Sequence, residues 1–266
     1  MHDRIQDHKW LPAALVLLCL FFFGVGFLTW SVYSIIVFFA LMLAGWYFKS
    51  ADAFLVSLTC ASITFFCKIA VIHILWPLPI IMALVLVFAA GRLLKFTRGG
   101  FDWIRKGDLG PRQIAAIAII SALSGMVLFG WYMIVKPNIS DLTGVVPHAT
   151  PVVLIATGLV FAFGNAACEE FVWRGIIFNA LERTIRPGAW VLCIQALSFG
   201  VAHAHGFPRG ASGIVLAGIY GYVLGLVRQD AKGLLAPIAA HFLADAVIYS
   251  ILASAVRATG AIVASP

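Results

Sequence analysis

Apolar stretches, each about as long as a bilayer is thick, follow one another from Leu11 to Val256 and leave no room for a soluble domain. Hydrophobic residues make up 62% of the 266-residue chain and charged residues only 11%, whereas soluble domains carry about a quarter charged residues. A helix needs about 20 apolar residues to cross a bilayer. The sequence therefore predicts an all-α fold, a polytopic transmembrane helical bundle with about eight or nine spans.

The expected helices are separated by charged or proline-containing connections, as between the third and fourth helices at Pro77 and Pro79. The first 112 residues contain no recognised motif, whereas residues 113–266 contain every motif described below, and both segments are expected to form one membrane domain. The helices are expected near residues 11–28, 31–48, 52–75, 77–96, 113–135, 151–183, 189–205, 211–228 and 234–256.

Alternate connections between the expected helices lie on opposite faces of the membrane and so form two sets. Lysine and arginine are distributed unevenly between these two sets. One set holds 13 of the 18 basic residues and the other holds 3, namely Lys136, Arg209 and Arg257. This clustering between spans argues against nucleic acid as a partner. By the positive-inside rule it predicts an integral protein of a bacterial inner or plasma membrane, with the amino terminus in the cytoplasm and the carboxyl terminus outside. Segment 97–112 is expected either to lie flat on the inner membrane surface or to form a solvated loop.

Two adjacent acids, Glu169 and Glu170, lie inside one of the apolar helices. A charge near the bilayer centre costs about 2.5–3.5 kcal/mol, so such a pair needs a compensating partner or a function. Glu170 and Arg174 are four residues apart and share a helical face, so we expect them to pair. Glu169 points about 100° away around the helix and has no cation at that spacing.

Two later apolar helices, the next one and the last, also contain ionisable residues. His203 lies near the end of one, and His241 and Asp245 lie four apart in the last. Three helices can therefore direct polar groups at a common interior, with the parts needed to hydrolyse an amide: a carboxylate to deprotonate water, an imidazole to support it, and donors for the oxyanion. Two other interpretations use the same residues, namely a structural tie between helices and a proton relay in a transporter.

These residues form three motifs, Glu169-Glu170-x-x-x-Arg174, Phe199-x-x-x-His203 and His241-x-x-x-Asp245. Together and in this order they resemble the motifs of the CPBP intramembrane proteases, which include the type II CAAX prenyl endopeptidases and their bacterial relatives. The resemblance covers about residues 150–250. It implies a helical bundle with the active site in an interior cavity and hydrolysis of a peptide bond.

The resemblance also implies a role for each motif residue. Glu169 would be the general base and His203 its partner on the attacking water. His241 and Asp245 would stabilise the oxyanion, although the family often has Asn at the latter position and Asp donates only when protonated. A glutamate-activated water without a metal is favoured. The alternative is a catalytic zinc held by Glu169, His203 and His241, a ligand set that suits this metal, although the H-E-x-x-H motif is absent.

The expected partners are the lipid bilayer and a membrane-anchored protein or peptide substrate. Either a carboxyl-terminal sorting segment or a lipidated terminus would suit such an endopeptidase. A non-catalytic scaffold or immunity-type protein is the main alternative function, with the proton-coupled transporter as the other.

Overall fold

The computed structural model describes residues 10–29, 31, 33–69, 75–185 and 187–263, and all regular structure within these ranges is helical. The all-α class is therefore confirmed for the described part of the chain. The helices are α1 (Leu11–Thr29), α2 (Tyr33–Tyr47), α3 (Ala51–Cys67), α5 (Leu78–Leu93), η2 (Lys95–Phe101), α6 (Pro111–Val135), η3 (Thr143–Val145), α7 (Pro151–Glu170), η4 (Phe171–Ile177), α8 (Phe178–Ile185), α9 (Ala189–Ala202), η5 (His203–His205), α10 (Gly210–Ala231) and α11 (Leu235–Val263).

Five helical segments are long and apolar enough to cross a membrane: α1, α6, the continuous run Pro151–Ile185, α10, and α11 as far as Ala258. Four shorter apolar helices, α2, α3, α5 and Ala189–His205, occupy the remaining expected segments. The chain therefore has the helices of an integral membrane protein. The number of crossings, expected to be eight or nine, stays a prediction.

One expected helix was too long. The helix expected over residues 52–75 ends at Cys67, where the backbone N–H of Lys68 donates to the carbonyls of Phe65 and Phe66. Residues 70–74 of that expectation lie outside the described part of the chain.

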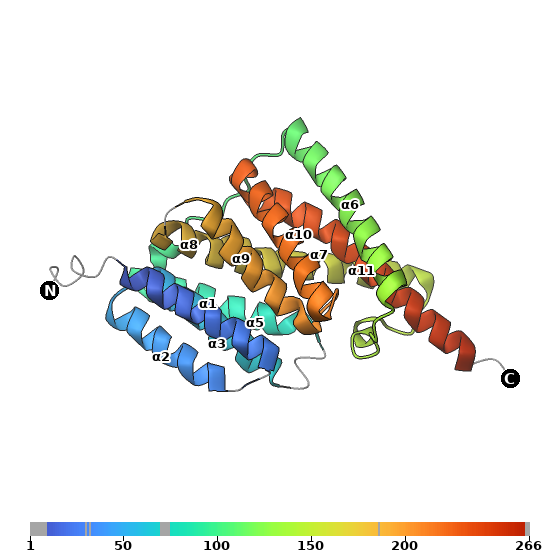
Figure 1. The fold of residues 1–266 in the computed structure, drawn as a ribbon, viewed down its shortest axis with the longest axis horizontal. Helices are drawn as coiled ribbons and strands as arrows, with labels where there is room; N and C mark the ends of the chain where they lie inside the picture. Colours follow the sequence, from blue (N-terminus) through green and yellow to red (C-terminus); the bar gives the residue numbers. More distant parts are fainter. Residues whose placement is uncertain (1–9, 30, 32, 70–74, 186, 264–266) are drawn as a thin grey trace.

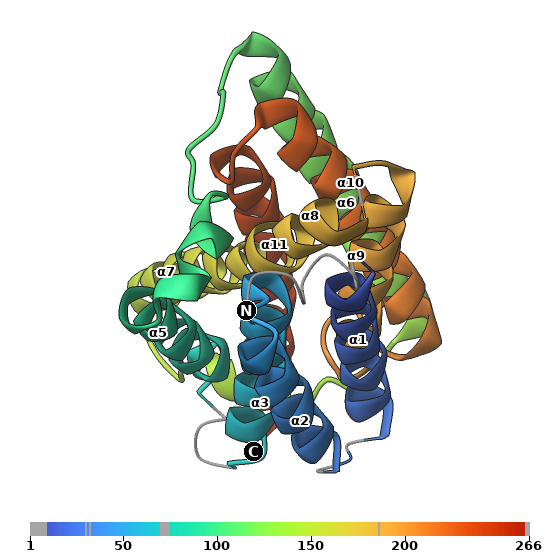
Figure 2. The same ribbon diagram turned by 90° about the vertical axis from the view of Figure 1, so that its left-hand side faces the viewer.

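The helices form two groups with a long helical rod between them. Helices α1, α2, α3 and α5 lie together in the lower part of both views. Helices α6 and α10 reach the upper part, and α11 runs from there down toward its carboxyl end (Figures 1 and 2). The rod formed by α7, η4 and α8 crosses between them, as Figure 2 shows. A hydrophobic core shared by α1, α3, α5, η4, α8 and α9 joins the amino-terminal helices to this rod. The rod is therefore buried where it carries the two glutamates.

Small residues bring α9 and α10 close together. A side chain at Gly200 would lie 2.5 Å from the carbonyl oxygen of Ile214, and one at Gly221 would lie 2.9 Å from the Phe199 ring. Such small residues let membrane helices approach at backbone distance. The approach brings the carbonyl of Gly221 to the polar groups of the rod.

The connections between helices meet in two separate sets. At one end, Arg183 pairs with Asp52 at 3.3 Å between Nε and Oδ2 and also donates to the carbonyl of Gly99. At the other, Arg209 donates to both carboxylate oxygens of Asp141 at 2.7 and 2.8 Å. These are the groupings that the uneven lysine and arginine distribution assigns to the two membrane faces. Which face is cytoplasmic stays a prediction, and Arg4, Lys9 and Arg186 lie outside the described residues.

The segment after α5 is attached to the helical bundle at Trp103. This side chain is only 1% exposed and its indole N–H donates to the carbonyl of Gly100 at 2.8 Å. It packs on Gly175, where an added Cβ would lie 2.6 Å from the ring. The segment is therefore anchored to the rod at this residue, because the rod has a glycine where the ring needs room. Residues 104–106 are exposed, and whether they lie on the membrane surface or in solvent stays a prediction.

Candidate active site

The two glutamates occupy the last two positions of α7, immediately before the π-helical turn η4 (Phe171–Ile177). Glu169 is 5% exposed and Glu170 is completely buried. A π-turn inside an α-helix is rare and often occurs at a functional site, because the widened turn redirects the side chains around it. The sequence predicted a continuous helix here and carried no signal for the π-turn. The rod therefore changes its helical geometry directly after the acid pair.

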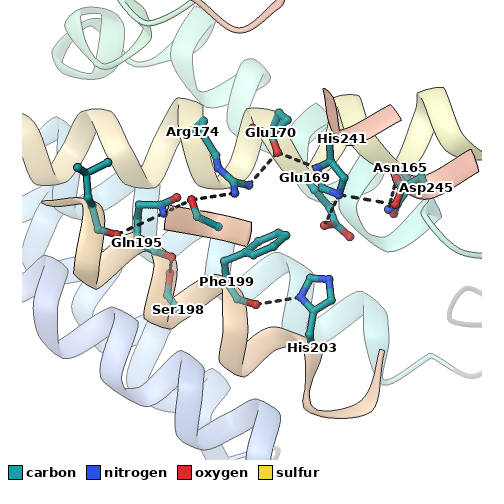
Figure 3. A network of polar contacts seen from close by, with 12 residues as sticks. Asn165, Glu169, Glu170, Arg174, Gln195, Ser198, Phe199, His203, His241 and Asp245 are labelled. Atoms are coloured by element: carbon teal, nitrogen blue, oxygen red, sulfur yellow. Dashed lines mark hydrogen bonds and ion pairs between the residues drawn. The ribbon is translucent and has the colours of Figure 1, made fainter. Parts of the chain in front are cut away.

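Glu170 is held by two partners through one oxygen. Its Oε1 accepts from Arg174 Nη1 at 2.8 Å and lies 2.7 Å from Nδ1 of His241 (Figure 3). All three side chains are at most 4% exposed. This ion pair is the one expected from the four-residue spacing, and His241 extends it to α11. Glu170 therefore joins the rod to the last helix.

Arg174 is enclosed by the rod, α9 and α10. Its Nη2 donates to the carbonyl of Gly221 at 3.2 Å, an oxygen that also accepts from Gln195 at 2.8 Å. The guanidinium lies 4.4 Å from the centre of the Phe199 ring, within the range of a cation–π contact. These contacts compensate the buried charge of Arg174 and hold three helices around it.

Glu169 is bound much less than its neighbour. Its Oε2 is buried and makes no hydrogen bond within the described part of the chain. The nearest cationic partner is Nε2 of His241, 3.7 Å away, which is beyond hydrogen-bond distance. Glu169 therefore keeps an oxygen available to a further molecule. Oε2 of Glu170 also lacks a hydrogen-bond partner in the described residues, but Oε1 of Glu170 already has two partners.

Asp245 lies one turn after His241 on α11. Its Oδ1 is 3.7 Å from His241 Nε2, the same distance as Glu169 Oε2. Its Oδ2 accepts from the side-chain amide of Asn165 at 3.0 Å, and the amide oxygen of Asn165 accepts from the indole N–H of Trp76 at 2.6 Å. Two carboxylates from different helices therefore face the same imidazole nitrogen.

Neither Asn165 nor Trp76 was expected as a site residue. The sequence does place Asn165, a polar residue in an apolar helix, four residues before Glu169 and on the same helical face. Nothing similar in the sequence indicates Trp76, because 89 residues separate it from its partner.

His203 is the first residue of η5, directly after α9. Its Nδ1 lies 2.9 Å from the carbonyl oxygen of Phe199, and its ring lies 4.5 Å from the Phe199 ring. No hydrogen bond or ion pair joins it to Glu169 or His241 in the described structure, but its ring and the Glu169 carboxylate point toward one another in Figure 3.

Glu169, His203 and His241, the ligands of the alternative zinc mechanism, are not arranged around a common point that a metal ion could occupy. No group of three or more His, Cys, Asp and Glu side chains in the described ranges is arranged to hold a metal ion. Nδ1 of His241 faces Glu170, and Nε2 is 3.7 Å from Glu169. A zinc ion on Glu169, His203 and His241 would need these side chains to move.

The six residues proposed from the sequence thus occupy one region of the interior. Glu170, Arg174 and His241 are in direct contact, Glu169 and Asp245 flank His241, and His203 faces Glu169. Five of them are buried and His203 is half-buried. The catalytic roles stay predictions, as does a water-filled cavity among these side chains.

The comparison with protein families agrees with the motifs. Residues 151–247 match the sequence model of the family described as Type II CAAX prenyl endopeptidase Rce1-like. The match begins at the first residue of α7 and ends two residues after Asp245, so it covers all six site residues. No curated protein and no solved structure matches the chain. The resemblance seen in the three motifs is thereby confirmed: the region that carries the site is similar to the type II CAAX prenyl endopeptidases.

Proposed function

We propose that this protein is an intramembrane endopeptidase that hydrolyses a peptide bond near a membrane-associated protein terminus with a glutamate-activated water. The family match supports a CAAX-type protease in general. The apolar helices support a substrate that is anchored in, or presented at, the same membrane.

The observation that carries the proposal is the unequal bonding of the two glutamates. Glu170 Oε1 already has Arg174 and His241 as partners, at 2.8 and 2.7 Å. Glu169 Oε2 is buried without a hydrogen-bond partner in the described part of the chain and faces the imidazole of His241. A general base must keep a lone pair free to reach the proton it removes. Both glutamates have an Oε2 atom without a hydrogen-bond partner, but Glu170 is completely buried and its charge is paired with Arg174. Glu169 has no cation within hydrogen-bond distance, so we assign it as the base and Glu170 as the residue that positions His241.

In the proposed reaction a water molecule lies between Glu169 and His203. Glu169 takes a proton from this water while the water oxygen bonds to the carbonyl carbon of the substrate. The carbonyl oxygen of the substrate becomes an oxyanion. The C–N bond then breaks, and the proton passes from Glu169 to the leaving nitrogen. The products are a carboxyl terminus and an amine, and Glu169 regains its starting form.

The oxyanion would be stabilised from α11. Because Glu170 binds Nδ1 of His241, the other ring nitrogen, Nε2, is directed toward Glu169 and Asp245. From there a protonated Nε2 can donate to a developing oxyanion. Asp245 can add a second donor only when its Oδ1 carries a proton.

The substrate class has two forms that one experiment can separate. Purified protein in lipid vesicles is incubated with a farnesylated peptide that ends in a CAAX sequence, or with an unlipidated peptide that carries a transmembrane carboxyl-terminal sorting segment. New peptide termini are detected by mass spectrometry. Cleavage of either peptide supports the proposal and identifies the substrate form.

The matched control uses the third glutamate of the chain. Glu169→Gln should abolish cleavage, because an amide cannot accept the proton, and should leave thermal stability nearly unchanged. Glu182→Gln, on α8 about three turns beyond Glu170, should cleave like the wild type. Cleavage that persists in Glu169→Gln would overturn the assignment, and wild-type protein that binds a peptide without cleaving it would favour the scaffold function.

A further inference from the structure

A chain of hydrogen bonds connects the amino-terminal helices to Asp245. It begins at Trp76, in the turn before α5, whose indole N–H donates to the side-chain oxygen of Asn165 at 2.6 Å. The side-chain amide nitrogen of Asn165 donates to Oδ2 of Asp245 at 3.0 Å. Asn165 and Asp245 are 6% and 2% exposed, so water does not compete freely for these bonds. Figure 3 shows the amide of Asn165 against the Asp245 carboxylate.

The direction of this chain follows from the chemistry of its first member. An indole N–H can only donate a hydrogen bond, whereas a side-chain amide has one accepting and one donating end. Asn165 must therefore present its oxygen to Trp76, since the opposite orientation would place two donors against each other. Its donating end is then directed at Asp245. A tryptophan from the amino-terminal segment thus sets the orientation of an amide beside the site.

The same logic extends to Asp245. Its Oδ2 is occupied as an acceptor, so Oδ1 is the oxygen left to face His241 Nε2 at 3.7 Å. If Asp245 carries a proton, that proton belongs on Oδ1, because a proton on Oδ2 would meet the amide hydrogen of Asn165. Oδ1 is therefore the atom that can donate to a substrate oxygen or accept from His241.

We propose that Trp76 and Asn165 are positioning residues that direct Oδ1 of Asp245 toward the reacting groups, and that the amino-terminal helices thereby contribute to catalysis. This inference rests on the proposed function. It gives the segment before residue 112, which contains no recognised motif, a direct connection to the site. Neither residue needs to touch the substrate.

The test compares two tryptophans that each donate one side-chain hydrogen bond. Trp76→Phe removes the N–H and keeps an aromatic ring. Trp131→Phe is the control, because Trp131 donates to Ser212 at 2.9 Å on the α6–α10 contact, outside the six-residue site. In vesicles with whichever peptide the wild type cleaves, Trp76→Phe should lower kcat about threefold to tenfold, the effect of losing one neutral hydrogen bond, and change KM less than about twofold. Trp131→Phe should leave both constants near the wild-type values.

A double-mutant cycle distinguishes positioning from a general loss of stability. Asn165→Ala should lower kcat at least as much as Trp76→Phe. Adding Trp76→Phe to Asn165→Ala should then cause no further loss, because Trp76 acts through the Asn165 amide. Thermal unfolding in detergent is measured for all variants, so that a loss of kcat can be compared with a loss of folded protein.

The outcomes separate this inference from the proposed function. Equal kcat values for Trp76→Phe, Trp131→Phe and the wild type would overturn the inference and leave the peptidase assignment intact. Fully additive losses in the double variant would also overturn it, because Trp76 would then act independently of Asn165. A wild type that cleaves neither peptide would overturn the proposed function and the positioning role together.

Discussion

Glu170 on α7 and His241 on α11 contact each other at 2.7 Å, between Oε1 and Nδ1, although 71 residues separate them in the sequence. The same oxygen also accepts from Arg174. One buried carboxylate therefore holds the rod to the last helix and orients the imidazole that faces Glu169.

Replacing Glu170 by Gln should lower the stability of the folded protein. The amide oxygen can still accept, but Arg174 would lose its charged partner, and breaking a buried ion pair costs about 3–5 kcal/mol. We expect a lower unfolding temperature in detergent and a loss of activity that is partly a loss of folded protein. Glu182→Gln is the control for removing a glutamate charge elsewhere. A Glu170→Gln protein that is as stable as this control but inactive, together with a Glu169→Gln protein that keeps activity, would instead make Glu170 the catalytic base.

Asp245→Asn should retain activity within about tenfold of the wild type. The motif that this chain resembles accepts Asn or Asp at this position. An asparagine can accept from Asn165 at one end and donate to a substrate oxygen at the other. Asp245→Ala, which has neither group, should lose considerably more, because removing one oxyanion-hole donor costs about 100-fold to 1000-fold in kcat. Steady-state kinetics with the cleaved peptide provide the comparison. Equal activity of the Asn and Ala variants would remove Asp245 from the oxyanion site.

Stringent chelation should leave peptidase activity largely intact, because the proposed base is a carboxylate and no step needs a Lewis acid. Metal analysis of active, purified protein should then find no stoichiometric zinc. The control is a zinc metalloprotease treated with the same chelator in the same vesicles. One tightly bound zinc per chain, with activity that disappears on removal and returns on addition, would contradict the glutamate mechanism and make Glu169, His203 and His241 the expected ligands.

Reporter fusions should place the two sets of connections on opposite membrane faces. Fusions after Lys106, Asp141, Ile185 and Arg257 are expected to report inside, outside, inside and outside. The contacts of Arg183 with Asp52 and of Arg209 with Asp141 already group the connections in this way. An inside signal after Arg257 would contradict nine crossings and favour eight. An outside signal after Lys106 would reverse the orientation.

The sequence predicted the positions of the helices well, because long apolar runs bounded by charge and proline define membrane helices almost completely. Expected segments such as 189–205 and 211–228 differ from α9 with η5 and from α10 by at most a few residues. The Glu170–Arg174 pair was also predictable, because a four-residue spacing fixes contact within one helix. These features depend on local sequence alone.

Other features depend on contacts between distant segments and could not be predicted. The partner of Trp76 is 89 residues away, and nothing in the local pattern specifies it. Trp103 is buried because Gly175 on the rod leaves room for its ring. In the sequence, Trp103 is an aromatic residue in a basic loop, and nothing near it indicates that it is buried. The π-turn after Glu170 likewise has no recognisable signal in the pattern of residues 171–177.

Acid should weaken the contact between Asp141 and Arg209, which joins two connections at one end of the bundle. The two hydrogen bonds from Arg209, together with its charge, hold the pKa of the Asp141 carboxyl below its usual value of 3.8. The folded protein therefore binds the proton more weakly than the unfolded chain does. The stabilisation is fully present above the usual pKa and is lost as the pH falls through the lowered one.

Asp141→Asn should thus lower the unfolding temperature near neutral pH and have no effect once the pH is below the lowered pKa. The difference should be small, below about 1 kcal/mol, because the Asp141 side chain is 59% exposed and solvent screens the pair. Unfolding in detergent is followed as a function of pH for both proteins. In an Arg209→Gln background, the same substitution should show no such pH dependence, because the cation that lowers the pKa is gone. A difference between Asp141→Asn and the wild type that grows as the pH falls would contradict this assignment of the pair.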